Sequence, residues 1–239
     1  MAFAGWQHAG KVFIEALFPG RCLQCGEWLL LDSDHSVPLC DDCRERLFLL
    51  NGARCKRCGI ELISEKDTCL RCRTAEYSFD SNMSLFAYSG AAKCLLAALK
   101  FGGRRRLAAF FAARAADALR AYGLDEAAVV PAPPRPGRHV PDAVELVARA
   151  LERHHGIDVF RLLRRAGVVQ QKSLDYERRR DNLKGKLSLV RGGSKRVLRR
   201  EVVLLDDVFT TGATLDACAR VLRAAGCRSV RAVTLVIEE

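Results

Sequence analysis

The sequence of 239 residues has no apolar run of the about 18 residues that a membrane-spanning helix needs. Its first residues also lack the continuous apolar stretch of a secretory signal, because Glu15 interrupts the apolar groups at Phe13 and Phe18. No Gly-x4-Gly-Lys-Ser/Thr sequence occurs, which excludes a P-loop nucleotide site. No low-complexity linker divides the chain. We therefore expect a cytoplasmic protein that does not span the membrane.

A strand, two acidic residues and a hydroxyl-rich loop follow one another near the end of the chain. Residues 202–205 are all apolar, which is typical of a strand covered on both faces of a parallel sheet. Asp206 and Asp207 come next, where open α/β sheets bind their ligands. The loop residues are Thr210, Thr211, Gly212, Ala213 and Thr214.

This arrangement predicts a site for a ribose 5-phosphate. Backbone N–H groups and hydroxyls at the start of a helix suit a monophosphate, and Gly212 allows it to approach closely. The two aspartates would repel that phosphate, so they instead suit ribose hydroxyls or a divalent cation. The alternative is a polar turn in which Thr214 merely caps a helix.

The segment resembles the phosphoribosyl pyrophosphate (PRPP) motif of the type I phosphoribosyltransferases, which has an apolar strand, two acidic residues and Thr-Thr-Gly-x-Thr. The resemblance implies that Asp206 and Asp207 are the catalytic residues and hold the ribose, directly or through Mg²⁺. It also implies that residues 210–214 bind the 5′-phosphate of PRPP.

Eight of the eleven cysteines form four Cys-x2-Cys pairs near the other end of the chain. They are Cys22 and Cys25, Cys40 and Cys43, Cys55 and Cys58, and Cys69 and Cys72. Two such pairs complete a tetrahedral set of four thiolates, so the spacing predicts two structural Zn²⁺ sites. Sequential pairing of the pairs is favoured over a crossed pairing, while iron and disulfides stay open as alternatives.

The length and the order of elements predict two parts. Residues 1–75 would form an N-terminal helix and a double zinc-ribbon module, and residues 76–239 a second domain. In the second part, strands near residues 84–88, 129–130, 187–190, 202–205 and 230–237 alternate with helices near 91–100, 104–122, 142–155 and 214–225. This alternation predicts a parallel, doubly wound α/β sheet, which is the fold of the type I phosphoribosyltransferases.

One segment accounts for the basic character of the chain. Residues 160–200 contain 14 Lys and Arg against three acidic residues, which equals the net charge of +11 of the whole chain. Residues 1–75 carry ten residues of each sign, so the cysteine-rich part is a poor binding surface for nucleic acid. The basic segment could close over a pyrophosphate, bind the backbone of single-stranded DNA, or simply be solvated.

Over nearly its full length the chain resembles the ComF family (ComFC/GntX-like proteins), in which a zinc ribbon precedes a phosphoribosyltransferase-like domain. Further matching pieces are 99–103, 129–133, 171–174 and 178–182. The resemblance implies a competence-associated protein that assists uptake of single-stranded DNA in natural transformation. DNA would bind residues 160–200, and a helicase-like partner would bind the zinc module.

The alternative function is an active phosphoribosyltransferase of nucleotide salvage, which would transfer phosphoribosyl from PRPP to a nitrogenous acceptor. Arg135 and Arg138, together with Arg178, Arg179 and Arg180, would then contact the departing pyrophosphate. The loop 138–142 departs from the Arg-Gly-Phe-Asn-Gln pattern of the family, so no residue identifies the acceptor.

Overall fold

We analysed the chain as a computed structural model. The structure describes residues 20–29, 37–48, 52–64, 66–136, 142–166, 185–191 and 201–238. The expected N-terminal helix, Arg138 and the three arginines at 178–180 lie outside the described residues.

Four parallel strands form the central sheet, in the order β1-β6-β5-β2. They are β1 (Asn82–Ala87), β2 (Ala128–Pro131), β5 (Val202–Phe209) and β6 (Val230–Ile237). Beyond β2, the segment at Val159 adds one parallel bridge to Val129. The parallel sheet predicted from the sequence is confirmed, and β5 continues four residues past the expected end at Leu205. The strand expected near residues 187–190 is not part of this sheet, because it pairs antiparallel with residues 163–165.

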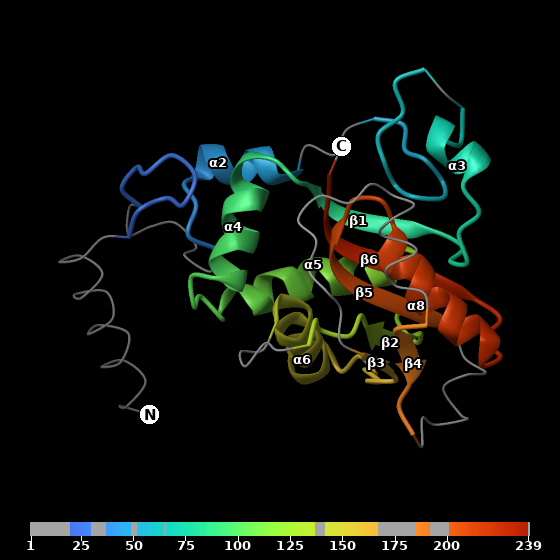
Figure 1. The fold of residues 1–239 in the computed structure, drawn as a ribbon. Helices are drawn as coiled ribbons and strands as arrows, with labels where there is room; N and C mark the ends of the chain where they lie inside the picture. Colours follow the sequence, from blue (N-terminus) through green and yellow to red (C-terminus); the bar gives the residue numbers. More distant parts are fainter. Residues whose placement is uncertain are drawn as a thin grey trace.

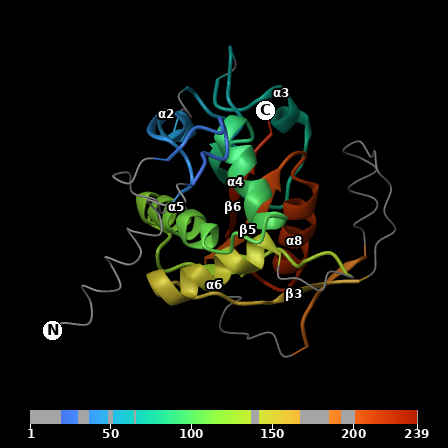
Figure 2. The same cartoon turned by 90° about the vertical axis from the view of Figure 1, so that its left-hand side faces the viewer.

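Helices cover both faces of this sheet (Figures 1 and 2). On one face lie α4 (Gly90–Lys100), α5 (Leu107–Ala121) and α6 (Ala143–His155), and on the other lies α8 (Ala213–Ala224). Alternating residues of β5 serve the two faces: Val203 and Leu205 belong to the buried cluster on the α4 face, and Val202 and Leu204 to the cluster on the α8 face. The sheet is thus doubly wound, as the sequence predicts.

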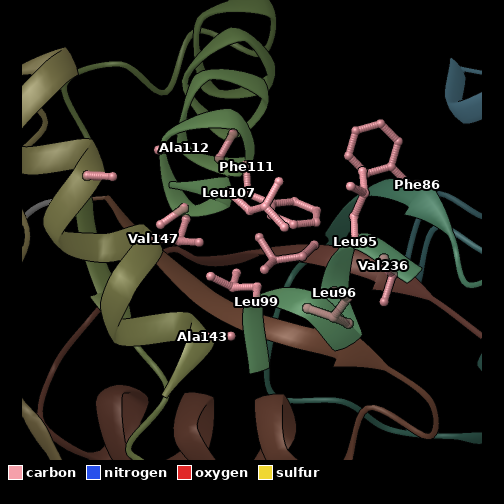
Figure 3. Packing of buried hydrophobic residues seen from close by; sticks show 14 of the residues in the cluster. Phe86, Leu95, Leu96, Leu99, Leu107, Phe111, Ala112, Ala143, Val147 and Val236 are labelled. Atoms are coloured by element: carbon pink, nitrogen blue, oxygen red, sulfur yellow. The ribbon is translucent and has the colours of Figure 1, made fainter. Parts of the chain in front are cut away.

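The core on the α4 face is packed from helices that are consecutive in the chain (Figure 3). Phe86 of β1 lies against the rings of Phe110 and Phe111 of α5, with ring centroids 5.8 and 6.1 Å apart. Leu95, Leu99 and Val147 fill the space between these rings and α6. This packing holds α4 against the sheet and so fixes the position of its last residue, Lys100.

A small antiparallel hairpin lies beside α8. It is made of β3 (Leu163–Arg165) and β4 (Leu187–Leu189), with Arg164 opposite Ser188. The hairpin joins the two ends of the basic segment predicted above, and residues 167–184 between them lie outside the described part of the chain.

The cysteine-rich elements lie on the side of the sheet where β1 is the edge strand (Figures 1 and 2). They are α2 (Asp41–Glu45), the 3-10 helix η1 (Arg46–Phe48) and α3 (Leu70–Thr74). Leu39 and Cys43 belong to the buried cluster of the α4 face, whereas Cys58 and Cys69 belong to that of the α8 face. The two metal modules therefore extend the two cores of the sheet.

No helix among the described residues is long and apolar enough to cross a membrane.

Candidate functional site

The eight paired cysteines gather into two groups of four. One group is Cys22, Cys25, Cys40 and Cys43, and the other is Cys55, Cys58, Cys69 and Cys72, with the sulfur atoms of each within 4.8 Å of one another. The sulfur atoms of Cys25 and Cys40 are 3.6 Å apart, and those of Cys58 and Cys69 are 3.7 Å apart. Four thiolates about 2.3 Å from one Zn²⁺ in tetrahedral geometry would be about 3.8 Å apart. The sequential pairing is confirmed, and the donor sets fit zinc.

Both groups are built in the same way. A first Cys-x2-Cys turn ends in a glycine with positive φ, +79° at Gly26 and +80° at Gly59, whose N–H donates to the first cysteine carbonyl. The third cysteine, Cys40 or Cys69, then lies at the N-cap of a five-residue helix. With four thiolates in each set, no coordination position is left for a substrate, so the metal would be structural.

We predict two zinc ions per chain, measured by plasma mass spectrometry of protein purified without added metal. Cys72→Ser should remove one ion and Cys94→Ser none, because Cys94 is outside both sets and instead donates to Gln24. Bound iron, or a metal content unchanged in Cys72→Ser, would contradict the assignment.

The second candidate site lies where the pairing of β2 with β5 ends. The pairing of the two strands ends at Pro131 and Leu205, and the last bond runs from the N–H of Ala132 to the carbonyl of Leu205. Beyond that point β5 has only β6 as a neighbour, with Asp206 opposite Thr234. The two carboxylates therefore occupy the opened edge at the carboxyl ends of the strands, where such sheets bind ligands.

The two aspartates face different elements. Asp207 forms an ion pair with Lys100 at the end of α4, with 2.6 Å between Nζ of Lys100 and Oδ2 of Asp207. Adjacent residues of a strand point to opposite faces, so Asp206 lies on the side of α8, where its charge acts on Cys218. The charge of Asp207 is thus neutralised by Lys100, whereas Asp206 has no such ion pair among the described residues.

The environment of Asp206 disfavours its ionised form. Burial, and next the charge of Asp207, raise the pKa of Asp206 from 3.8 to about 8. A carboxylate in this environment favours a ligand that brings hydroxyl donors or a cation, since either would stabilise the ionised form.

The loop after β5 leaves two backbone donors free. Gly212 is the N-cap of α8 with φ +75°, and the N–H of Asp216 donates to its carbonyl. Within the described residues, the N–H groups of Thr211 and Gly212 donate to no protein acceptor. Free N–H groups at a helix N-terminus are an anion-binding arrangement, and α8 is long enough, with 12 residues, to add a dipole.

Arg165 of the hairpin interacts electrostatically with Asp206. The Nε of Arg165, in β3, is buried and has no hydrogen-bond partner among the described residues. Burial, and next the charge of Arg135, lower the pKa of Arg165, while Asp206 acts in the opposite direction. Of the five arginines that the sequence assigns to pyrophosphate, the structure describes only Arg135, and it adds Arg165 as a neighbour.

Comparison with known proteins gives a domain match near each end of the chain. The double zinc ribbon domain matches residues 13–73, and the phosphoribosyl transferase domain matches residues 165–238. "Competence protein ComFC" of Streptococcus pneumoniae (strain ATCC BAA-255 / R6) is 27% identical over 230 residues, which cover 90% of this chain and 99% of the relative. "Competence protein F" of Haemophilus influenzae (strain ATCC 51907 / DSM 11121 / KW20 / Rd) is 28% identical over 224 residues, which cover 90% and 95%. The resemblance to the ComF family is confirmed.

Solved structures give weaker likenesses to this chain. The allosteric regulatory enzyme of purine biosynthesis is 21% identical, with a TM-score of 0.34 over 54% of this chain and 26% of that one. A hypoxanthine phosphoribosyltransferase from Staphylococcus aureus is 13% identical, with a TM-score of 0.35 over 54% and 62%. The fold assignment therefore depends on the topology of the chain itself and on the matched domain.

Sequence reasoning assigned no role to Lys100, although it lies in the segment 99–103 that contributes to the ComF resemblance. The signal was a lysine directly before Phe101-Gly102-Gly103 at the end of a helix. Only the packing of α4 shows that this lysine reaches Asp207, 107 positions later in the chain.

We predict that Asp206→Asn stabilises the ligand-free protein at neutral pH by about 1 to 3 kcal/mol, since it removes a carboxylate whose ionisation burial opposes. Between pH 3.8 and about 8 the unfolded chain has released a proton that the folded protein retains. The stability of the wild type should therefore fall as pH rises through this range, and the variant should show less of this fall.

Urea unfolding at pH 5, 7 and 8.5, without Mg²⁺ or PRPP, measures the effect. Asp207→Asn is the matched control and should destabilise by about 1 kcal/mol, because it leaves the half-buried Lys100 without its ion pair. Equal destabilisation by both variants would contradict the assigned environment of Asp206.

Proposed function

We propose that this protein binds PRPP with Mg²⁺ at the carboxyl end of β5 and acts in the competence system that takes up single-stranded DNA. The observation that carries the proposal is the succession of Asp206, Asp207 and two free N–H groups at the opened edge of the sheet. This site offers acceptors for ribose hydroxyls and donors for a phosphate within one turn of chain.

Each part of PRPP has a chemically matching group. Asp206 and Asp207 would accept hydrogen bonds from the ribose hydroxyls, and residues 210–214 would hold the 5′-phosphate. Bound Mg²⁺ would neutralise part of the pyrophosphate charge. Lys100, Arg135 and Arg165 would supply the remaining positive charge on that side.

The cationic groups also favour a second candidate, transfer of phosphoribosyl from PRPP to a nitrogenous acceptor. In that reaction the nitrogen forms a bond to C1 of the ribose, the C1–O bond breaks, and pyrophosphate leaves with both bonding electrons. Lys100 and Arg165 would stabilise the negative charge of the leaving group. Lys100 is already held by its ion pair with Asp207, and the buried Nε of Arg165 has no hydrogen-bond partner among the described residues.

The role in competence is supported by the relatives named as competence proteins, each matched over almost its whole length. The described ends of the basic segment also contribute positively charged side chains, at Arg164, Arg165, Lys186 and Arg191. A DNA strand along this segment would lie beside α8 and thus close to the PRPP site.

Calorimetric titration of Mg²⁺-PRPP tests the proposed site, and we expect a dissociation constant on the order of micromolar. The double variant Asp206→Asn, Asp207→Asn should lose the binding. The double variant Asp41→Asn, Asp42→Asn is the matched control, because these adjacent aspartates lie in the exposed first turn of α2 and their loss changes the net charge equally. No binding by folded, zinc-loaded wild type would refute the proposal.

In a transformable host that depends on a related gene, we expect the wild-type chain to restore uptake-dependent transformation. The Asp206→Asn, Asp207→Asn variant should restore it at least tenfold less well at equal protein level. Transformation frequency with genomic DNA is the measurement, and full complementation by the variant would separate the competence role from the PRPP site.

A further inference from the structure

The second zinc ribbon, residues 53–74, touches the phosphate loop directly. Nη1 of Arg71 donates to the carbonyl of Thr210 at 2.8 Å, although the two residues are 139 positions apart. The hydroxyl of Tyr77, three residues after the ribbon, donates to the carbonyl of Thr211 at 3.0 Å. Two successive peptide groups of the loop are therefore held from the same side.

These two bonds decide where the free loop amides point. In a trans peptide the carbonyl and the N–H of the following residue point in opposite directions. Holding the carbonyl of Thr210 therefore turns the N–H of Thr211 away from the ribbon, and holding that of Thr211 does the same for Gly212. These are the two N–H groups that donate to no protein acceptor within the described chain.

Aromatic rings fill the space under the loop. Tyr77 is 5% exposed and stacks on Phe79 with 4.7 Å between ring centroids, and Phe79 meets the ring of Phe209 at 6.3 Å. A Cβ on Gly212 would lie 3.0 Å from Phe209 and 3.1 Å from Tyr77. The loop thus rests on these rings and cannot sink further towards the core.

A third bond fixes the start of α8. The N–H of Ser78 donates to Oδ1 of Asp216 at 2.8 Å, and Asp216 is fully buried with Arg220 2.5 Å from its other oxygen. The second ribbon therefore holds the beginning of the loop, and the segment that leaves the ribbon holds its middle and the helix that follows.

The two ribbons differ at the positions that make these contacts. In the second ribbon the residue before the last cysteine of each knuckle is an arginine, Arg57 or Arg71. Arg57 donates to the carbonyl of Tyr77 and so fixes the position of Tyr77, whose hydroxyl bonds Thr211. The equivalent residues of the first ribbon are Gln24 and Asp42. The contacts are thus specific to one copy of an otherwise repeated module.

A metal ion would keep Arg71 in place. Arg71 lies between the ligands Cys69 and Cys72 in α3, which is only five residues long. Helices this short are not stable by themselves in water. Coordination of both cysteines would supply the missing restraint, so the position of Arg71 depends on the second metal site.

We propose that the second zinc ribbon, and not the first, positions the phosphate loop, with Arg71 and Tyr77 as the positioning residues. The inference rests on the proposed binding of a ribose 5-phosphate group at residues 210–214. It gives the second metal site a function in ligand binding, although no ligand touches the metal.

Calorimetry with ribose 5-phosphate, Mg²⁺-PRPP and Mg²⁺-pyrophosphate tests this on Arg71→Gln and Tyr77→Phe. Each variant should raise the dissociation constants of ribose 5-phosphate and PRPP by the same factor, about three- to tenfold. The dissociation constant of pyrophosphate should stay unchanged. Tyr77→Phe retains the ring under Gly212 and removes only the hydroxyl. Arg73→Gln, on the same exposed helix, is the charge-matched control and should bind all three ligands as the wild type does.

Hydrogen exchange of the ligand-free protein separates this proposal from the proposed function. We expect exchange within residues 210–216 to be faster in Arg71→Gln and Tyr77→Phe than in the wild type and in Arg73→Gln, with two zinc ions retained. If no variant changes this exchange, the positioning role is wrong, whatever the wild type binds. If the exchange changes but the wild type binds no PRPP, the proposed function is wrong, while the second ribbon still positions the loop.

The metal dependence is tested by removing one ligand from each ribbon. Cys72→Ser should lower the affinity for ribose 5-phosphate at least as much as Arg71→Gln, while Cys25→Ser, an exposed ligand of the first ribbon, should leave it within twofold. Equal loss in both variants would overturn the assignment to the second ribbon. Should Cys72→Ser fail to fold, the Arg71 and Tyr77 variants decide the matter.

Discussion

The pairing of β5 with β2 ends at Leu205, while its pairing with β6 continues to Phe209. This difference of four residues creates the opened edge on which Asp206 and Asp207 lie. Had both neighbours ended together, the two aspartates would be in a loop with no fixed direction. Because one neighbour continues, the strand alternation persists and sends Asp207 to Lys100 and Asp206 to the α8 face.

The zinc ribbons are integrated with the sheet and are not separate appendages. Leu39 and Cys43 join the core under α4, and Cys58 and Cys69 join the core under α8. The amide of Asn82, at the start of β1, donates to the carbonyl of Cys58, which connects the second ribbon to the sheet edge. Small metal modules gain stability from such shared burial, since their own cores are too small.

Local chemistry was readable from the sequence, whereas long-range contacts were not. The parallel sheet, the position of α6 near residues 142–155 and the two cysteine groups follow from the alternation of apolar segments and from Cys-x2-Cys spacing. The contacts of Lys100 and Arg71 could not be predicted, because each depends on how distant helices pack. The extension of β5 was also missed, since two adjacent carboxylates are unusual within a strand and are compatible with it only at an open edge.

Gly212 has a backbone of φ +75° and two aromatic rings within 3.1 Å of where a Cβ would be. Any other residue there would face both a strained backbone and a steric clash, and relieving the clash would displace Tyr77, whose hydroxyl holds Thr211. Sequence variation at position 212 is therefore restricted twice over, by the loop itself and by the segment leaving the ribbon. Loss of Tyr77 in a homologue would lift only part of this restriction, because the positive φ and the ring of Phe209 would remain.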